Sequence, residues 1–405
     1  MSHVIVGAGL AGVRTAEGLR EAGYDGEVVL LGAEEHRPYD RPPLSKDYLQ
    51  GATDQDGVFL QSAAWFGEHG VDLRTGTAVA AIDRGAAEVV LADGERIGYE
   101  RLVLATGSSA RRLPIPGTEL DGVLHLRTLD DSDRLRAGIL SASRVAVIGG
   151  GWIGLEVAAA ARTAGAEVTV LEAAGQPLEA ALGPRIGAAF AALHREHGVD
   201  VRLGVHVTDI VGKGGLARGV RLGNGDVVEA DVVLVGVGAA PNIGLAEAAE
   251  LELDDGVLVD ERLCTSDPRI HAVGDIAAIW YPALERRLRV EHWATAQNTG
   301  PVAAAAVLGL PAATYDALPY FFTDQYDLGM EYTGYAGPGE ADELVVRGDL
   351  ERHEYVAFWL RGGRLLAGMN VNIWDVTEDI ERLIRSGGTL DPRRLADPDV
   401  SLADL

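Results

Sequence analysis

Cysteine is nearly absent from this chain of 405 residues, in which Cys264 is the only one. A single thiol cannot form an internal disulfide, a CxxC redox pair or a thiolate cage for a metal. We therefore expect Cys264 to be a small packed residue. Any redox chemistry of this protein is expected to proceed without thiols.

Positive charge is also scarce, since 35 Lys and Arg residues stand against 61 Asp and Glu residues and the formal net charge is −26. A field of this sign repels phosphate backbones, which argues against a general nucleic-acid binder. An acidic partner would need a local basic patch. Lysine is rarer still: Lys46 and Lys213 are the only two lysines, and all the other basic residues counted here are arginines.

Long hydrophobic runs are missing as well. The chain passes from Met1-Ser2-His3 directly into the apolar residues 4–6, which leaves no room for the two regions of a signal peptide. The longest uncharged stretch, residues 294–315, contains Gln, Asn, Gly and Pro and is rich in alanine. We expect a buried helix there, no membrane span, and a cytoplasmic protein without a membrane partner.

The remaining composition is that of a globular protein, with 47% hydrophobic and 24% charged residues. These fractions exclude disordered, collagen-like and coiled-coil classes. The length predicts two or three domains.

An internal repeat organises the chain, because VIVGAGLAG at residues 4–12 recurs as VAVIGGGWIG at residues 145–154. Each copy joins an apolar strand, a GxGxxG turn, a helix-length stretch that ends in Gly23 or Gly165, and a second β-branched strand. The glycines of such a βαβ unit permit a tight turn and let a pyrophosphate approach the helix N-terminus. Two copies predict two dinucleotide sites.

The acid expected to bind the adenosine ribose distinguishes the copies. Glu172 ends the second strand of the later copy, and no cationic side chain follows before Arg185, so this site should prefer NADH to NADPH. In the earlier copy the equivalent position is Gly32; of the nearby acids Glu34 and Glu35, we take Glu34 as the ribose ligand.

Three further apolar runs end in small or polar residues typical of the crevice of a doubly wound sheet. Residues 102–107 end in Thr106-Gly107, residues 234–238 contain Gly236, and residues 270–275 end in Gly-Asp. Asp275 would place a carboxylate where the polyol chain of a flavin is held. An ordinary strand exit or turn residue is the alternative for each.

Four motifs carry a resemblance to a known family: RPPLSK at residues 41–46, GGGWIGLE at 149–156, TSDP at 265–268 and DQYD at 324–327. With the two glycine turns, they make the chain similar over nearly its whole length to FAD-dependent NADH:ferredoxin reductases of the putidaredoxin reductase type. The resemblance implies FAD as the cofactor, NADH as the hydride donor and a small 2Fe-2S ferredoxin as the partner. In this family the ferredoxin serves a monooxygenase or dioxygenase, which the resemblance therefore implies here. A flavin suits this task because it accepts two electrons and releases them singly.

The resemblance implies an α/β fold of two Rossmann-like dinucleotide-binding domains, for FAD and NADH, plus a C-terminal α+β domain with antiparallel strands. The FAD domain would comprise residues 1–112 and 240–318, the NADH domain 113–239 and the C-terminal interface domain 319–405. In the last part, the runs 354–360 and 364–369 predict antiparallel strands. A final helix should begin with a capping box of Asp375 and Glu378 and end at Gly387.

The resemblance also implies site residues. Lys46 and Glu156 would be the catalytic pair at the flavin edge; in isolation they read as a surface charge and a helix N-terminal acid. No metal site is expected. The predicted FAD-binding residues are Gly7, Gly9, Ala11, Gly12, Glu34, Arg41, Lys46, Val79, Thr106, Gly107, Arg127, Asp275 and Trp293. The predicted NADH-binding residues are Gly149, Gly151, Ile153, Gly154, Glu172 and Gly236.

Two histidines, His194 and His197, have the i,i+3 spacing of a metal-binding pair, but no third ligand accompanies them. We interpret them as a solvated helix face. In the family a Trp often stands where this chain has Phe322, next to the flavin.

The sequence leaves other functions open. The acceptor could be rubredoxin or a small molecule such as a quinone, and a non-enzymatic flavin–NADH redox sensor is a further alternative. Thiol-disulfide reductases share the plan but need a cysteine at the flavin. A ferredoxin could dock on Arg286, Arg287 and Arg289; the alternative is a solvated loop that Glu285 and Glu291 partly neutralise.

Overall fold

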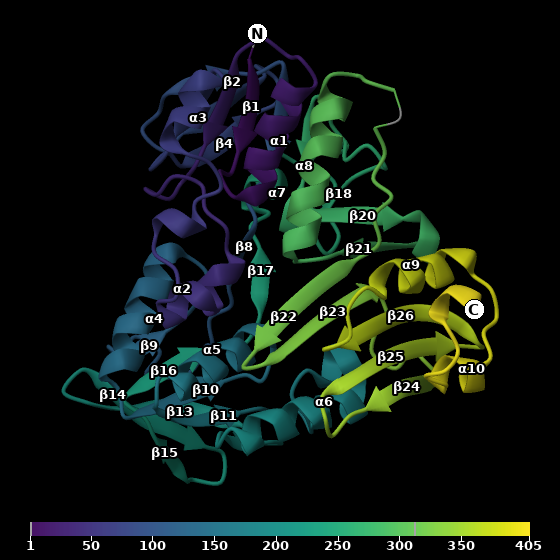
Figure 1. The fold of residues 1–405 in the computed structure, drawn as a ribbon. Helices are drawn as coiled ribbons and strands as arrows, with labels where there is room; N and C mark the ends of the chain where they lie inside the picture. The colour runs from purple at the N-terminus through teal and green to yellow at the C-terminus, as the bar shows by residue number, and fades with distance from the viewer. Residues whose placement is uncertain (1, 312) are drawn as a thin grey trace. The chain divides into compact units, whose positions relative to one another are not determined.

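The computed structural model describes residues 2–311 and 313–405, and the chain divides into two compact units (Figure 1). Unit 1 comprises the chain up to Asp40 together with Gln55–Ser109 and Ala240–Tyr320. Unit 2 comprises Arg41–Asp54, Ala110–Ala239 and Phe321–Leu405. The three domain ranges expected from the sequence stay a prediction.

Unit 1 is built on a five-stranded parallel sheet. Its three inner strands are rich in Val, Ile and Leu and are buried on both faces, whereas the edge strand of residues 71–74 is partly exposed. The order is β19 (Ile270–Ala272), β7 (Arg101–Leu104), β1 (His3–Val6), β2 (Val28–Leu31) and β3 (Val71–Arg74).

Helices α1 (Leu10–Glu21) and α8 (Trp293–Val307) of unit 1 lie side by side (Figure 1). Glycines permit the close approach, because a Cβ on Gly18 would stand 2.9 Å from the Cβ of Ala304, and one on Gly300 would stand 2.6 Å from that of Arg14. The predicted buried helix therefore exists, but it ends at Val307 where Gly309 adopts φ +67°. Residue 312, inside the stretch expected to be helical, lies outside the described residues.

The rest of unit 1 consists of small sheets and short helices. They are the antiparallel sheet β4 (Val79–Asp83), β5 (Glu88–Leu91) and β6 (Arg96–Gly98); the sheet β18 (Val257–Leu258), β20 (Ala277–Tyr281) and β21 (Arg286–Arg289); and the helices α3 (Ala63–Glu68) and α7 (Gly244–Ala248). Two of the boundaries between the units fall inside β8 (Ser108–Ala110) and β17 (Ala239–Pro241).

Unit 2 repeats the parallel architecture, which confirms both predicted βαβ units. Its parallel sheet has the order β12 (Asp200–Arg202), β11 (Glu167–Leu171), β10 (Arg144–Ile148), β16 (Val232–Val235) and β9 (Val123–Leu124). The other elements of this part are α2 (Asp47–Gln50), α4 (Leu129–Ser141), α5 (Trp152–Thr163), α6 (Glu179–Glu196) and the sheet β13 (Val207–Lys213), β14 (Leu216–Leu222) and β15 (Val227–Glu229).

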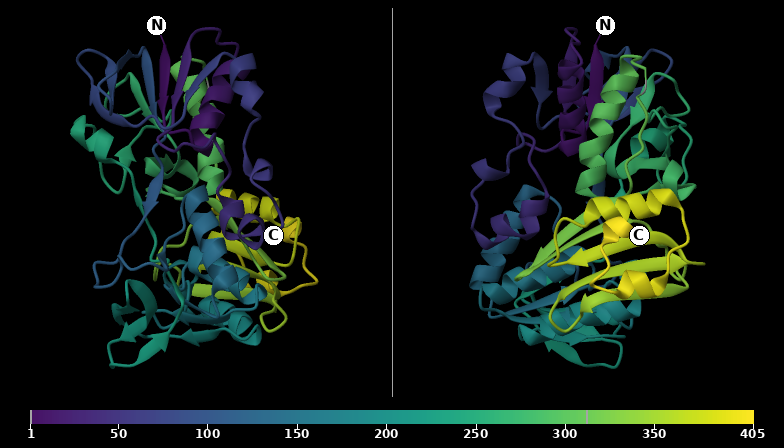
Figure 2. Two further views of the ribbon diagram at one scale, coloured as in Figure 1. Left: turned by 90° about the vertical axis from the view of Figure 1, so that its left-hand side faces the viewer. Right: turned by 45° about the vertical axis from the view of Figure 1, so that its right-hand side comes forward.

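The C-terminal part of unit 2 is an antiparallel sheet, as predicted. Its order is β22 (Tyr320–Gln325), β23 (Leu328–Gly334), β26 (Arg364–Val371), β25 (Glu354–Arg361) and β24 (Glu343–Asp349). Helix α9 (Thr377–Ser386) packs on β23 and β26, and α10 (Pro392–Ala396) packs on β24 (Figure 2).

The predicted capping box of α9 is wrong at its first position. Asp375 adopts φ +62°, and the N-cap is Val376, which makes no side-chain capping bond. The C-terminal prediction is confirmed, because Gly387 ends the helix in the left-handed conformation at φ +59°. In the part of the chain that the structure describes, no helix is both long and apolar enough to cross a membrane.

Candidate functional site

The first glycine turn lies at the carboxyl edge of the parallel sheet of unit 1. Gly7 adopts φ +116°, and a Cβ there would stand 2.1 Å from the carbonyl oxygen of Ala105, just past β7. Gly12 is similarly restricted by the carbonyl oxygen of Gly7, 2.0 Å from its Cβ position. By contrast, Gly9 is the N-cap of α1 and its Cβ position has no atom within 4 Å. Packing thus requires two of the glycines and leaves the third facing open space.

Neighbouring strand ends bring further predicted residues to this edge. The hydroxyl of Thr106 donates to the carbonyl of Asn242 at 2.7 Å, which fixes the turn after β7. Asp275 follows β19 and is buried, and a Cβ on the preceding Gly274 would stand 3.1 Å from that of Ala11. Glu34, past the end of β2, accepts a hydrogen bond from the hydroxyl of Tyr39.

Two other predicted FAD residues of unit 1 lie at element starts. Val79 begins β4, and Trp293 begins α8 with its indole N–H donating to Asp40 at 2.9 Å. Arg41, Lys46 and Arg127 belong to unit 2, where the Arg41 guanidinium donates to the backbone carbonyl of Arg127.

The second glycine turn repeats this geometry in unit 2. Gly149 adopts φ +103°, and its Cβ position lies 2.4 Å from the carbonyl oxygen of Gly236 at the end of β16. Gly154 is restricted by the carbonyl oxygen of Gly149 at 2.1 Å, whereas Gly151, the N-cap of α5, has no atom within 4 Å of its Cβ position. Ile153 is 41% exposed in the first turn of α5.

Glu172 closes this second cradle. Its two carboxylate oxygens accept the backbone N–H groups of Gly150, at 2.6 Å, and of Ala174, at 2.7 Å. The acid is therefore held beside the glycine turn at the end of β11, where a ribose ligand is expected.

The two helix starts fit pyrophosphate groups. Both α1 and α5 begin at a glycine that provides no side-chain cap, and neither has an acidic residue in its first turn. The N-terminal N–H groups and the positive end of each helix dipole are thus available to an anion. The residues present therefore suit FAD and NADH at these two turns.

Lys46 and Glu156, 110 positions apart in the chain, form a salt bridge of 2.7 Å inside unit 2. The side chain of Glu156 is 4% exposed and that of Lys46 is 15% exposed. A buried carboxylate needs compensating donors. Two hydroxyl groups supply them at 2.5 Å each, from Ser45 to Oε2 and from Thr323 to Oε1.

Sequence reasoning gave Ser45 and Thr323 no role. Ser45 lies inside the RPPLSK motif and could have been suspected from its place next to Lys46. Thr323 had no such signal, because its role depends on how β22 packs against α5. Phe322 lies with its ring centroid 5.7 Å from the Lys46 ammonium, so an aromatic ring does border the pair. Burial raises the pKa of the nearby Asp324 above its usual value.

The interpretation of His194 and His197 as a solvated helix face is wrong for His194. His194 is fully buried, and its Nε2 lies 2.9 Å from Oε1 of Gln325 on β22. Burial lowers its pKa to about 4. His197 stacks on Tyr326 at 3.7 Å between ring centroids. The sequence could not show the burial of His194 because β22, which covers it, lies about 130 positions further along the chain. Within residues 2–311 and 313–405, no group of three or more His, Cys, Asp or Glu side chains could hold a metal ion.

The arginine cluster on β21 is partly neutralised. Arg289 pairs with Glu291 and with Asp255, the latter at 3.3 Å, and its side chain is only 8% exposed. Arg287 donates to the carbonyls of Val259 and Ala278 at 2.6 and 2.7 Å.

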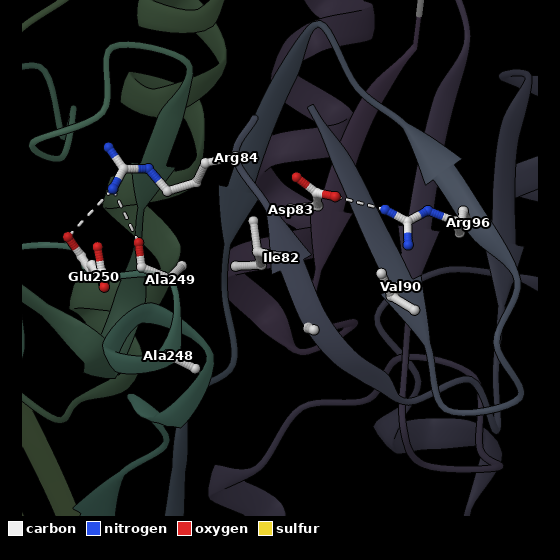
Figure 3. A pocket seen from close by; sticks show the side chains of 9 residues that line it. Ile82, Asp83, Arg84, Val90, Arg96, Ala248, Ala249 and Glu250 are labelled. Carbon is white, nitrogen blue, oxygen red and sulfur yellow. Dashed lines mark hydrogen bonds and ion pairs between the residues drawn. The ribbon is translucent and has the colours of Figure 1, made fainter. Parts of the chain in front are cut away.

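A cavity of about 480 Å³ lies elsewhere in unit 1, between β4, β5 and α7 (Figure 3). Its arginines are already engaged, Arg84 with the carbonyls of Ala249 and Glu250 and Arg96 with Asp83. None of the predicted site residues lines this cavity.

Comparisons with known proteins agree with this geometry. A family model described as pyridine nucleotide-disulphide oxidoreductase matches residues 1–300, and one described as reductase C-terminal matches residues 320–405. The ferredoxin–NAD(+) reductase component of the anthranilate 1,2-dioxygenase system of Burkholderia cepacia is 44% identical over 98% of both chains. Rubredoxin-NAD(+) reductase of Pseudomonas putida is 37% identical over 92% of this chain and 96% of that protein.

Among solved structures, a chain of the covalent putidaredoxin reductase–putidaredoxin complex superimposes with a TM-score of 0.95 and 36% identity, covering 100% of this chain and 97% of that one. The chain therefore belongs to the pyridine nucleotide-disulphide oxidoreductase family. Its relatives include ferredoxin reductases, among them putidaredoxin reductase, which confirms the resemblance found in the sequence.

Proposed function

We propose that this protein is an FAD-dependent NADH:ferredoxin reductase that passes single electrons to a small 2Fe-2S ferredoxin serving an oxygenase. The buried salt bridge between Lys46 and Glu156 carries the proposal, since it joins the two residues that the family resemblance assigns to the flavin edge. Such a pair is costly to bury, which favours a functional reason for its presence.

Two cradles would hold the two dinucleotides. FAD would lie on the turn of Gly7, Gly9 and Gly12 in unit 1, and NADH on that of Gly149, Gly151 and Gly154 in unit 2. We extend the proposal to the predicted domain ranges, residues 1–112 with 240–318 for FAD, 113–239 for NADH and 319–405 as the interface domain, and to a cytoplasmic location.

The bound flavin would supply two-electron uptake and one-electron release. The chain's own contribution is positional and electrostatic. Glu156 orients the Lys46 ammonium, and the hydroxyls of Ser45 and Thr323 keep the carboxylate in place. With a flavin bound as the resemblance implies, the ammonium would be able to donate a hydrogen bond to it.

The reaction is tested by NADH-dependent reduction of cytochrome c with and without a panel of carriers. We expect strong dependence on an added 2Fe-2S ferredoxin. Rubredoxin is the second candidate acceptor because the rubredoxin-NAD(+) reductase of Pseudomonas putida is 37% identical to this chain. Equal rates without any carrier, or with a quinone alone, would contradict the proposal.

We expect NADH to give a higher kcat/KM than NADPH by at least about tenfold, or about 1.4 kcal/mol. The reason is that Glu172 is held beside the turn by two backbone N–H groups and would repel a 2′-phosphate. Steady-state kinetics with both donors measure this ratio. Glu172→Gln, which keeps the side-chain size, should reduce the preference, and equal efficiency of the two donors in the unaltered enzyme would refute the assignment.

Ferredoxin docking on β21 is a second measurable expectation. The test uses Arg286→Glu with Arg287→Glu and leaves Arg289, whose side chain is only 8% exposed, unchanged. We expect the KM for ferredoxin to rise several-fold at low salt and its salt dependence to weaken, while NADH reduction of the flavin is unchanged. The matched control reverses Arg393 and Arg394 on α10. If only the control raises the KM, docking occurs there and not on β21.

A further inference from the structure

Strand β22 places two polar side chains on one buried face. Thr323 and Gln325 alternate with Asp324, so both point to the same side, and they are 0% and 1% exposed. Glu156 of α5 and His194 of α6 lie on that side, and all four residues belong to unit 2.

These residues form one continuous chain of hydrogen bonds. The Thr323 hydroxyl donates to Glu156 at 2.5 Å, and the Gln325 amide nitrogen donates to the Thr323 hydroxyl at 3.3 Å. His194 Nε2 lies 2.9 Å from the Gln325 amide oxygen, and the hydroxyl of Tyr326 lies 3.4 Å from His194 Nδ1.

The direction of every bond in this chain follows from donor chemistry. The Gln325 amide oxygen only accepts, so His194 must carry a proton on Nε2. In a neutral imidazole Nδ1 then accepts the Tyr326 hydroxyl. The amide nitrogen then faces Thr323, whose oxygen is occupied as an acceptor and whose hydrogen points to Glu156. A neutral imidazole satisfies this pattern, in agreement with the lowered pKa of His194.

We propose that His194 and Gln325 are positioning residues that act through Thr323 to hold the Glu156 carboxylate against Lys46. The inference rests on the proposed role of the Lys46–Glu156 pair. Without the His194 donor, the amide of Gln325 can rotate and present its oxygen to Thr323. The hydroxyl hydrogen of Thr323 would then leave Glu156, which would lose one of its three side-chain donors.

The first experiment compares two variants of His194 in the holoenzyme. His194→Gln can place an amide N–H near the position of Nε2, whereas His194→Phe fills the space without a donor. We expect the limiting rate of flavin reduction by NADH, measured by stopped flow, to fall about tenfold in His194→Phe and to stay within about twofold in His194→Gln. The Kd for NADH should be unchanged in both.

A second experiment tests whether the residues act in series. Gln325→Leu and Thr323→Val should each slow reduction about tenfold, and the double variant should be no slower than the slower single variant. Thr333→Val makes the same change at a buried position of the same sheet, on β23, and should leave the rate unchanged.

A third measurement is independent of activity. In holoenzyme with ¹⁵N-labelled histidines, the histidine signal that vanishes in His194→Phe should be that of a neutral, Nε2-protonated tautomer near pH 7. In Gln325→Leu this histidine should lose its single-tautomer signature.

Clear outcomes would overturn the proposal. A folded His194→Phe that reduces its flavin at the unaltered rate refutes the proposal, and so does a His194→Gln that is as slow as His194→Phe. The proposal also fails if His194 is protonated on Nδ1. It fails as well if the effects of the Thr323 and Gln325 variants are additive. If Glu156→Gln is slow while Gln325→Leu is not, only this inference fails. If Glu156→Gln is also fast, the proposed role of the pair fails.

Discussion

Replacing Glu156 by Gln is expected to slow flavin reduction by NADH about a hundredfold, equivalent to about 2.7 kcal/mol of transition-state stabilisation. The variant keeps the side-chain shape but removes the charge that orients the Lys46 ammonium, and it places an amide beside the Ser45 and Thr323 hydroxyls. FAD should remain bound, because Glu156 lies outside both glycine turns. Stopped-flow absorbance measures the rate and any change in the charge-transfer band.

The matched control is Glu17→Gln, which neutralises another buried carboxylate, paired with Arg14 in α1 of unit 1. It should lower stability as the loss of any buried charge partner does, while reduction by NADH stays at its unaltered rate. Equal slowing in both variants would mean that the Glu156 effect is general destabilisation. Unaltered kinetics in Glu156→Gln would mean that the salt bridge between Lys46 and Glu156 is only structural.

The second large effect is expected at the turn of the NADH cradle. Gly154→Ala should destabilise unit 2 by about 3 kcal/mol, because the added Cβ would stand 2.1 Å from the backbone carbonyl oxygen of Gly149. Gly151→Ala places its Cβ in open space at the N-cap of α5, so the fold should remain close to the unaltered stability. Urea unfolding followed by circular dichroism separates the two variants.

The same pair distinguishes packing from binding. Gly151→Ala fills the position where a pyrophosphate would approach the helix start, so its Kd for NADH should rise by about tenfold or more while FAD content is unchanged. Unchanged affinity for NADH in this folded variant would place the dinucleotide away from the turn.

Local sequence was sufficient for the parts of the fold that depend on neighbours in the chain. The two βαβ units were predictable because glycine spacing, strand composition and helix length all lie within about 30 residues, and the structure has them at β1–α1–β2 and β10–α5–β11. The antiparallel pairing of β25 with β26 was predictable for the same reason, since Gly362 and Gly363 form the turn between them.

The start of α9 shows where a local pattern is ambiguous. Asp375 and Glu378 have the spacing of a capping box, but Asp375 adopts φ +62° and Val376 is the N-cap. A three-residue spacing is compatible with several backbone conformations at Asp375. The conformation that occurs is the one that allows α9 to pack on β23 and β26.

The sequence by itself determined the two glycine turns and the position of Glu172 after the second one. It also contained the motifs from which the family could be identified. The family resemblance already implied that Lys46 pairs with Glu156, and the structure contains this salt bridge. Only the tertiary structure decided that Ser45 and Thr323 complete the carboxylate's bonds. The same holds for the burial of His194 against Gln325. The physical reason is that a buried charge must find its donors in space, and the donors here lie 110 to 167 positions away, beyond any pattern of neighbouring residues.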